Sequence, residues 1–458
     1  MLLEIFDSYR QSIYPYYQWR RGHVWIILTH VCRKWRAIVL ASASRLDLGV
    51  TVGPEKPDDI ESILSGLLPI LIDYNCVRRE MTGSALQRMH AALRHHDRVR
   101  EITFQGGSAD FKKFLKATNC PFPILESLAF EFIYDEAKIP ETFLRGPDHS
   151  ILHLRHLHLC FTSLSSISGF LLSATALTNL CLVIDTVPST TTETSLLACL
   201  QGMPCLGHLD LSILSESLGQ PSRPTPEDIV PLSKLTYFDY TGSSMFLDAL
   251  VAGLSAPSLR DVTFNFYQAT DWPPFVHLSR FINEIERCYH AVHVAFQNWG
   301  FLLSILTQSE YIGHCDPRVN LGSESSCPPE SIMQMSGELS AMFTTVEDLR
   351  VIFDKLSVHV WVDNIPWRRF LLHFHNLKAL RIESVDDVRT YSIARSLLQD
   401  HEEPGNDIAF LPSLEEIELG KVPSSIDESE CGPELVAFQR FVTARQQAGR
   451  PVKLSFGP

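Results

Sequence analysis

The sequence lacks the short motifs by which many nucleotide-binding proteins and hydrolases are recognised. No two of its 23 glycines lie two positions apart, which excludes the GxGxxG loop of dinucleotide-binding proteins and kinases. Neither a GxxxxGKS/T phosphate loop nor a GxSxG nucleophile turn occurs. His401-Glu402 resembles the start of a zinc-protease motif, but the second histidine is missing and Pro404 opposes the helix that such a motif needs. We therefore expect that the protein is not an enzyme and binds no cofactor.

Paired cysteines are absent as well. The eleven cysteines are an odd number and form no CxxC, so they do not suit a disulfide framework. We expect reduced thiols in a reducing compartment, the cytoplasm or the nucleus. Glu4 and Asp7 interrupt the N-terminus before any long apolar region, so no signal peptide is expected.

Positive charge is scarce over most of the chain. The 39 Lys and Arg residues face 53 Asp and Glu residues, and the net charge of -14 disfavours general binding to nucleic acid or to an anionic membrane. Residues 1–48 are the exception, with seven basic residues against three acidic ones.

Residues 156–184 contain no Asp, Glu, Lys or Arg and are long enough to span a bilayer, but their many Ser and Thr residues favour a soluble protein.

The sequence does contain an internal repeat. Apolar residues recur at positions one, four and six of successive units, which begin at Leu125, Leu154, Leu177, Leu206, Leu235, Leu259, Leu377 and Leu414, with weaker copies at Val99, Tyr289 and Val346. The intervals between the first six starts are 29, 23, 29, 29 and 24 residues, in or close to the range of leucine-rich repeats. This spacing predicts one short strand and one helix in each unit.

Each unit is expected to bury one face of its strand. Residues four and six point to the core, while residue one lies under the preceding turn. Leu278, Phe281 and Ile282 have the spacing of an amphipathic helix between two strands. Such units bury their apolar surface only when they stack, so the expected fold class is α/β: an irregular leucine-rich-repeat-like solenoid with a curved parallel sheet and outer helices.

Breaks and ends of the repeat region can also be assigned. Residues 219–231, 313–330 and 401–412 predict surface loops. Residues 434–447 predict a helix that Gly449 and Pro451 end, and residues 452–456 predict a last strand. The expected domains are a helical segment at 1–48, a helical connector at 49–95, and a solenoid at 96–458 that is closed by the C-terminal helix and strand.

Residues 1–48 resemble an F-box. The matching stretches are Leu3-Glu4-Ile5-Phe6, then Leu28-Thr29-His30-Val31-Cys32-Arg33-Lys34-Trp35-Arg36, then Ile38 and Leu46-Asp47-Leu48. This match covers about a tenth of the chain, and Val-Cys-x-x-Trp-Arg after a helical leucine is its most specific part. The remaining body, which ends in an Ala-Gly-Arg-Pro-Val strand, resembles the large fungal F-box proteins with irregular leucine-rich repeats.

The resemblance implies a substrate-recognition subunit of a cullin-RING ubiquitin ligase of the SCF type. The F-box would dock on the Skp adaptor and through it on the cullin scaffold, and the solenoid would bind an unknown target protein. The adaptor-binding residues that carry over are Leu3, Ile5, Phe6, Val31, Cys32 and Trp35. Without adaptor binding, the same fold would be a protein-interaction scaffold outside any ligase.

Strand alternation also predicts which residues would meet a target protein. The residues that flank position four point away from the core and should line the exposed face of the sheet. On this face we expect the target-binding residues His156, His158, His208, Asp210, Tyr237, Asp239 and Asp261. His153, His156 and His158 are the best candidates for metal ligands, although ordinary exposed histidines fit the pattern better, and no metal site is expected.

Overall fold

A computed structural model divides the chain into two compact units. The first unit comprises residues 1–191 and 198–206, and the second comprises residues 192–197 and 207–458. Helix α8 (Glu193–Gln201) is therefore divided between the two units. The structure describes residues 31–41, 50–53, 68–75, 81–118, 121–132, 139, 143, 153–162, 164–184, 193–214, 229–267, 276–285, 289–297, 300–307, 318–323, 328–353, 365–384, 387–398, 410–420 and 433–456.

The first unit is a parallel sheet with helices. Its strands lie side by side in chain order and every described pairing between neighbours is parallel: β1 (Val50–Val52), β2 (Ile70–Asn75), β3 (Val99–Gly106), β4 (Ser127–Phe132), β5 (His156–Thr162) and β6 (Asn179–Ile184). Its helices are α3 (Arg33–Ala41), α5 (Gly83–Leu93), α6 (Ser108–Ala117) and α7 (Leu164–Leu171), with the short η3 (His96–Arg98) before β3.

The stretch 49–95, expected as a helical connector, contains two of these strands. In β2 the side chains of Ile70, Ile72 and Tyr74 are buried on one face, and this period of two is that of a strand. The ring of Tyr74 stacks on Phe104 of β3 at 5.2 Å between centroids. The sheet therefore begins earlier than the repeat pattern indicates, because β2 joins it through the same aromatic core that β3 and α6 share.

The second unit is also mixed α/β with a mostly parallel sheet. Its strand order is β7 (His208–Ile213), β9 (Tyr237–Gly242), β11 (Asp261–Phe266), β14 (Arg318–Ser323), β13 (Gly300–Leu306), β12 (Ala291–Gln297), β15 (Asp348–Phe353), β16 (Ala379–Ser384), β17 (Glu416–Leu419) and β18 (Lys453–Phe456). The short strands β8 (Val230–Pro231) and β10 (Leu254–Ser255) pair separately in parallel. The helices are α9 (Ser244–Ala252), α10 (Val276–Asn283), α11 (Pro329–Glu338), α12 (Ser340–Phe343), α13 (Trp367–Leu371), α14 (Asp387–Leu398) and α15 (Pro433–Gln447).

Strands β13 and β14 depart from the parallel pattern. β13 runs antiparallel to both of its neighbours, β12 and β14, whereas β14 is parallel to β11 and β12 is parallel to β15. The prediction of a surface loop over 313–330 is therefore wrong for β14 and for the start of α11. Val319 and Leu321 of β14 are each 2% exposed, so alternate apolar residues hold this strand in the sheet despite the loop-like composition around it.

Parallel strands in each unit place equivalent repeat positions opposite one another. In the second unit, the position-four residues Leu209, Phe238 and Val262 are register partners and all are 0% exposed. Before each strand, the position-one residue closes a turn, as where the N–H of Leu235 donates to the carbonyl of Leu232 at 3.0 Å. Burial of a large apolar side chain stabilises a fold by about 1.5–3 kcal/mol, so this repeated row is the main source of sheet stability.

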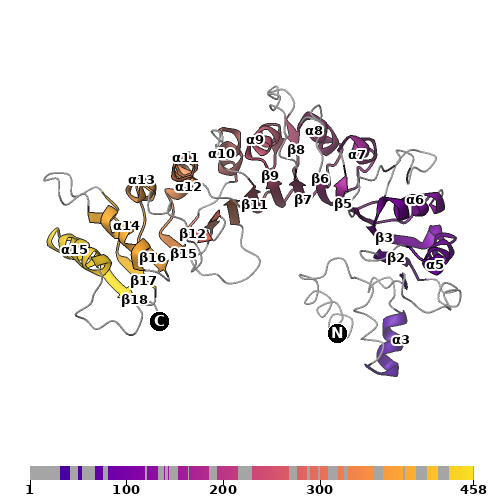
Figure 1. Cartoon of the computed structure of the whole chain (residues 1–458), viewed down its shortest axis with the longest axis horizontal. Helices are drawn as coiled ribbons and strands as arrows, with labels where there is room; N and C mark the ends of the chain where they lie inside the picture. Colours follow the sequence, from indigo (N-terminus) through magenta and orange to yellow (C-terminus); the bar gives the residue numbers. More distant parts are fainter. Residues whose placement is uncertain are drawn as a thin grey trace. The chain divides into compact units, whose positions relative to one another are not determined.

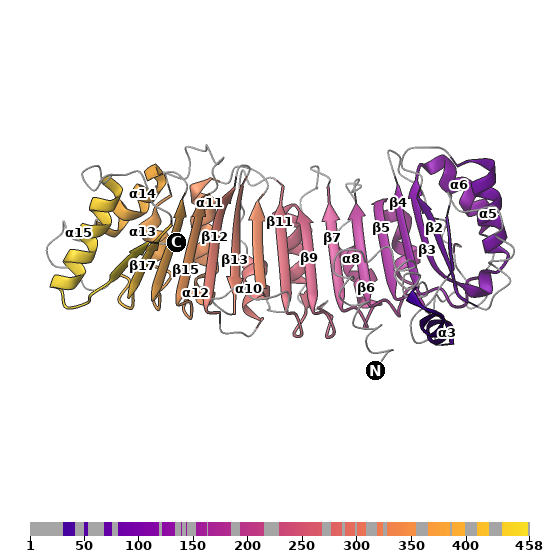
Figure 2. The same cartoon turned by 90° about the horizontal axis from the view of Figure 1, so that it is seen from below.

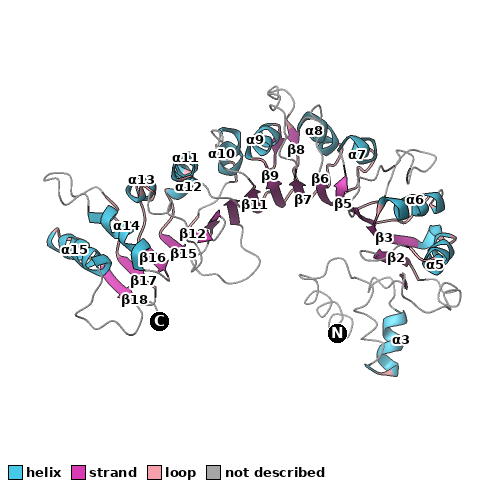
Figure 3. Cartoon of the chain, viewed as in Figure 1, coloured by secondary structure: helices cyan, strands magenta, loops and turns pink. Residues whose placement is uncertain are grey.

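The helices of the second unit lie on the face of its sheet that carries this apolar row (Figure 1, Figure 3). In the perpendicular view, the strands stand in front of the helices and show the opposite face (Figure 2). Along β7, β9 and β11 the side chains alternate between half-buried and buried, as strand geometry requires. The opposite face therefore presents its side chains to solvent.

The C-terminal helix and strand are confirmed at α15 and β18. The side chain of Arg445 in α15 is only 3% exposed, and its guanidinium donates to the carbonyls of Phe410, Pro412 and Leu414 at 3.4 to 3.5 Å. Gly449 follows the helix at a φ of 75°, a left-handed conformation that glycine adopts without strain. These contacts join the last helix to the turn that precedes β17.

Gly242 at the end of β9 provides a test of this packing. A Cβ atom at this position would lie 2.9 Å from the carbonyl oxygen of Ile213 and 2.6 Å from the hydroxyl of Tyr240. Because the carbonyl belongs to the backbone and cannot move aside, we expect Gly242→Ala to lower the free energy of unfolding by about 1–3 kcal/mol. Urea-induced unfolding measures the change.

Gly337 in α11 is the matched control. No atom lies within 4 Å of a Cβ built on it, and alanine is a better helix former than glycine. We expect Gly337→Ala to leave the urea midpoint unchanged or to raise it. Equal effects of the two substitutions would contradict the close approach of β7 and β9 at this point.

Candidate binding face

The exposed face of β7, β9 and β11 brings together five of the predicted target-binding residues. His208 and Asp210 come from β7, Tyr237 and Asp239 from β9, and Asp261 from β11. The parallel register places His208 opposite Tyr237, Asp210 opposite Asp239, and Tyr237 opposite Asp261. We call these five side chains the acidic-aromatic face.

Two aromatic rings stack within this face. The rings of His208 and Tyr237 lie 4.1 Å apart between centroids with an angle of 3° between their planes. The hydroxyl of Tyr237 donates to Asp239 Oδ2 at 3.0 Å. Burial lowers the pKa of His208, so this imidazole is neutral near pH 7 and does not offset the neighbouring negative charge.

Burial and the carboxylates of the neighbouring strands raise the pKa of Asp239. The pKa of Asp239 is raised to about 6, first by burial and then by the charges of Asp210 and Asp261, against the opposing hydrogen bond from Tyr237. Burial and the neighbouring carboxylate also raise the pKa of Tyr237, so its hydroxyl remains a donor. The charged form of Asp239 is therefore disfavoured within the acidic-aromatic face.

The same face of the second unit is balanced over its last strands. Arg350 of β15 pairs with Glu383 of β16, and Arg381 of β16 pairs with Asp348 of β15 at 3.2 Å and with Glu418 of β17 at 3.4 Å. Lys453 of β18 pairs with Glu416 of β17 at 2.8 Å. Arg381 lies directly opposite Glu418, and Glu416 lies directly opposite Lys453, the favourable arrangement for cross-strand pairs. Arg350 and Arg381 lie opposite each other, and each pairs diagonally with a carboxylate of the neighbouring strand.

His156 and His158 lie on β5 in the first unit. His158 Nε2 and the thiol of Cys160 are 2.8 Å apart, and His158 is the register partner of Cys181 on β6. Burial lowers the pKa of His158 to about 4, so its ring is neutral at physiological pH. Within the described part of the chain, no three His, Cys, Asp or Glu side chains gather closely enough to hold a metal ion.

Half of the predicted adaptor-binding residues can be placed. Val31 and Cys32 immediately precede α3, and both side chains are exposed, Val31 at 56%. Trp35 lies in the first turn of α3, and its side chain is half-buried. The backbone N–H of Trp35 donates to Cys32 Sγ at 3.4 Å. Leu3, Ile5 and Phe6 lie outside the described residues.

Sequence reasoning missed three residues that shape the face of the second unit. His293 and Arg350 flank position four of the weak repeat copies that begin at Tyr289 and Val346, so the same alternation rule would have found them. Asn320 lies on β14, within a stretch that was assigned to a loop, and its amide donates to Thr263 Oγ1 at 3.5 Å. No sequence signal marked Asn320, because β14 does not follow the repeat.

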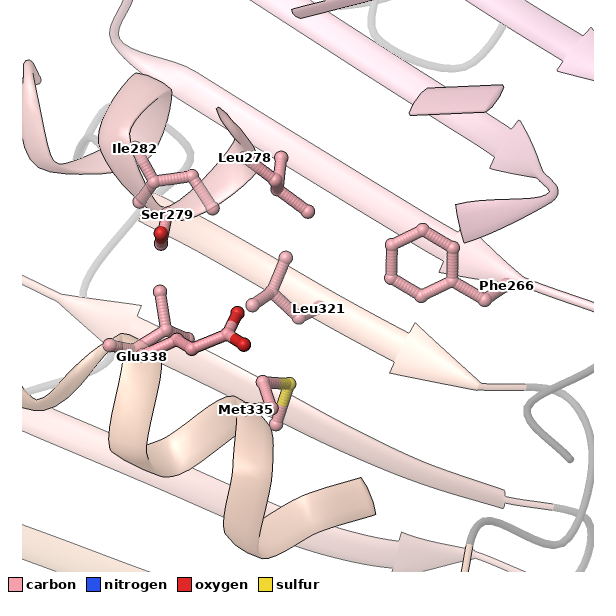
Figure 4. Close-up of a pocket in the computed structure, with 8 residues that line it drawn as sticks. Phe266, Leu278, Ser279, Ile282, Leu321, Met335 and Glu338 are labelled. Atoms are coloured by element: carbon pink, nitrogen blue, oxygen red, sulfur yellow. The ribbon is translucent and has the colours of Figure 1, made fainter. Parts of the chain in front are cut away.

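A cleft lies on the helix side of the second unit, between α10 and α11 and over β14 (Figure 4). Phe266, Leu278, Leu321 and Met335 are among its apolar lining residues, and Glu338 is the single ionisable residue of the lining. It forms where β13 and β14 widen the sheet between the two helices. A pair of titratable groups, the usual minimum for acid–base catalysis, does not line this cleft.

No model of a known protein family matches the chain, and no curated protein matches it either. None of the described helices combines the length and the apolar character that a membrane crossing requires.

The raised pKa of Asp239 predicts a pH dependence of stability. Folding raises the pKa of the Asp239 carboxyl from 3.8 to about 6, so the folded state binds a proton more tightly than the unfolded state does. The resulting stabilisation is complete at pH values below 3.8 and is lost as the pH rises through about 6. We expect Asp239→Asn to remove this loss and to stabilise the protein at pH 8 by about 1–2 kcal/mol, after allowance for solvent screening.

Unfolding in urea at pH 5 and pH 8 measures this effect. The difference between the urea midpoints at pH 5 and pH 8 should be smaller for Asp239→Asn than for the wild-type protein. A pH dependence that is identical in the wild-type protein and Asp239→Asn would show that this carboxylate is not strained.

Proposed function

We propose that this protein is the substrate-recognition subunit of a cullin-RING ubiquitin ligase of the SCF type. Residues 1–48 act as an F-box that docks on the Skp adaptor and thereby on the cullin scaffold. The rest of the chain is an irregular leucine-rich-repeat-like solenoid whose exposed sheet face binds a target protein. On this proposal the protein is not itself an enzyme, needs no cofactor, and works in the cytoplasm or the nucleus.

The observation that carries the proposal is the exposed apolar surface beside α3. Val31 is 56% exposed and Cys32 is exposed, within the stretch whose Val-Cys-x-x-Trp-Arg pattern resembles an F-box. An isolated valine on a surface needs no explanation, but here it adjoins the half-buried Trp35 in a short helical segment. Together with the F-box-like pattern, these accessible apolar side chains suit docking on an adaptor.

The sheet of each unit supports the solenoid part of the proposal. Several connections between parallel strands contain a helix, such as α7 between β5 and β6 and α9 between β9 and β11. The strands of the repeat bury the residues at positions four and six, which is the behaviour expected of stacked repeats. In the repeat that begins at Leu235, the hydroxyl of Tyr240 donates to the carbonyl of Ser243 at 2.8 Å and so holds the turn after β9. The unequal repeat lengths suit an array that is irregular rather than uniform.

A protein-interaction scaffold without adaptor binding is the second candidate function. The exposed sheet face of the second unit suits a binding role in either case, because repeat proteins commonly bind partners on such a face. The two functions differ in one property only, the interaction with the Skp adaptor.

Substitution of Val31 separates the two. We expect the purified full chain to bind the Skp adaptor, and we expect Val31→Asp to weaken that binding at least about tenfold, because a buried interface aspartate without a partner costs more than 1 kcal/mol. The affinity is measured by calorimetry or by surface plasmon resonance. Since Val31 is exposed, the substitution should leave the urea midpoint unchanged.

Val276→Asp is the matched control. Val276 is 61% exposed at the start of α10 in the second unit, so the chemical change is the same at a site that the proposal does not use. The ligase function would be contradicted if the Skp adaptor did not bind the wild-type chain, or if it bound the wild-type chain and Val31→Asp equally. The scaffold would then be the remaining candidate function.

A further inference from the structure

Helices α5 and α6 of the first unit lie side by side on the outer side of its sheet (Figure 1, Figure 2). The backbone N–H of Met81, just before α5, donates to Asp110 Oδ2 in the first turn of α6 at 2.9 Å, so the starts of the two helices adjoin. Both helices connect parallel strands of one sheet and therefore run in the same direction. Residues at equal distances from the two helix starts are therefore neighbours.

These two helices present no carboxylate to solvent. Helix α5 contains no acidic residue. The single acidic residue of α6 is Asp110, which is 6% exposed and pairs with Lys113 at 2.8 Å. A partner that contacts the outer surface of α5 and α6 therefore meets basic and uncharged side chains.

Four basic side chains are exposed on this surface. His90 and Arg94 are four residues apart on α5 and its C-cap, and Lys112 and Lys116 are four residues apart on α6. Residues with this spacing share one side of a helix. A helix rises about 1.5 Å per residue, so His90 lies about 12 Å and Lys116 about 14 Å from the adjoining helix starts, at nearly the same height. We call these four side chains the basic face.

The charge of this region is opposite to that of the whole protein. Residues 81–118 contain seven Lys and Arg residues and three Asp and Glu residues, whereas the whole chain has a net charge of -14. Within this stretch, Arg98 donates to the carbonyl of Leu68, and Arg100 pairs with Glu126. The other Lys and Arg residues of the stretch lie on α5, at its C-cap and on α6, so the helix side of this unit attracts an anionic partner.

The surroundings of the basic face favour an acidic protein segment over a nucleic acid or a membrane. Phe111 and Phe114 of α6 are 1% and 0% exposed, so they offer no ring on which a base could stack. Among the described residues, none of the exposed large apolar side chains lies on α5 or α6, so these helices do not suit insertion into lipid.

The net charge of the chain acts in the same direction. A nucleic acid or a membrane extends beyond the screening length of about 8 Å at physiological salt and would meet the repulsion of the acidic protein as a whole. A short acidic segment responds only to the charges beside it. Charge complementarity therefore points to a few Asp and Glu residues as the ligands of the basic face.

We propose that the basic face of α5 and α6 docks an acidic segment of a partner protein. Carboxylates of that segment pair with Arg94, Lys112 and Lys116, and the guanidinium of Arg94 holds one carboxylate through two N–H groups. The proposal goes beyond the proposed function, because neither the adaptor-binding segment nor the exposed sheet face takes part in this docking.

Fluorescence anisotropy on the full chain tests the proposal with three labelled probes: hexaglutamate, hexaglutamine and a single strand of six thymidine nucleotides. We expect hexaglutamate to bind more tightly than the nucleotide strand, to bind more weakly as salt is added, and hexaglutamine not to bind. Arg94→Gln should weaken hexaglutamate binding about threefold, and its combination with Lys112→Gln and Lys116→Gln about tenfold or more. All three side chains are exposed, so the urea midpoints should not change.

Arg155→Gln is the matched control, because Arg155 is an exposed arginine of the same unit that lies just before β5, outside the basic face. Equal losses for Arg155→Gln and Arg94→Gln would mean that the probe reads net charge alone, and would overturn the proposal, as would the absence of hexaglutamate binding. Tighter binding of the nucleotide strand would assign the face to a nucleic acid instead. Self-association of the chain that the triple substitution abolishes would assign it to a second copy. The assay contains no adaptor, so a failed adaptor interaction does not affect its result.

Discussion

The burial of one apolar row across neighbouring parallel strands is the constraint on which the rest of this structure depends. Position-four residues such as Leu209, Phe238 and Val262 are register partners with no exposed surface. A shift of one residue in any strand would turn these side chains to solvent, so the register is fixed. Once it is fixed, the residues between them are also fixed opposite one another on the other face.

The chemistry of the exposed face follows from that register. Asp210 and Asp239 are held opposite each other because their neighbours in sequence must be buried, and His208 is held against Tyr237 for the same reason. The register therefore enforces contacts on the exposed face that are not favourable by themselves, such as two carboxylates opposite each other. Where those contacts pair opposite charges, as between Arg381 and Glu418, they stabilise the sheet, and where they pair like charges, as between Asp210 and Asp239, they raise the pKa of a carboxyl.

Much of the fold could be predicted because it repeats. The apolar triplets located the strands β4 to β7, β9, β11, β16 and β17, and the helix periodicity located α10 and α15. The antiparallel strands β13 and β14 could not be predicted, since their place in the sheet depends on pairing with β12 and β11 rather than on a local pattern. Strand β2 was missed for a related reason: its buried residues, such as Tyr74, match the alternation of a strand but no copy of the triplet.

The candidate face was predictable in its residues but not in its contacts. Alternation alone placed Tyr237 and Asp239 on the exposed side, whereas the ring stack with His208 and the raised pKa of Asp239 depend on which strands are neighbours. Sequence periodicity defines a face within a strand, and only tertiary structure defines which strands share it.

Thiol labelling of two adjacent positions on β11 tests the central claim most directly. Val262 is 0% exposed and belongs to the buried row, while Thr263 is half-buried on the opposite face, and cysteine is a modest change at either position. Alkylation of Val262→Cys and Thr263→Cys in the native protein can be followed peptide by peptide by mass spectrometry. The account predicts that residue 263 reacts at least about tenfold faster than residue 262, because only an accessible thiol reacts readily. Equal rates, or faster reaction at residue 262, would contradict the fixed register and with it the assignment of the binding face.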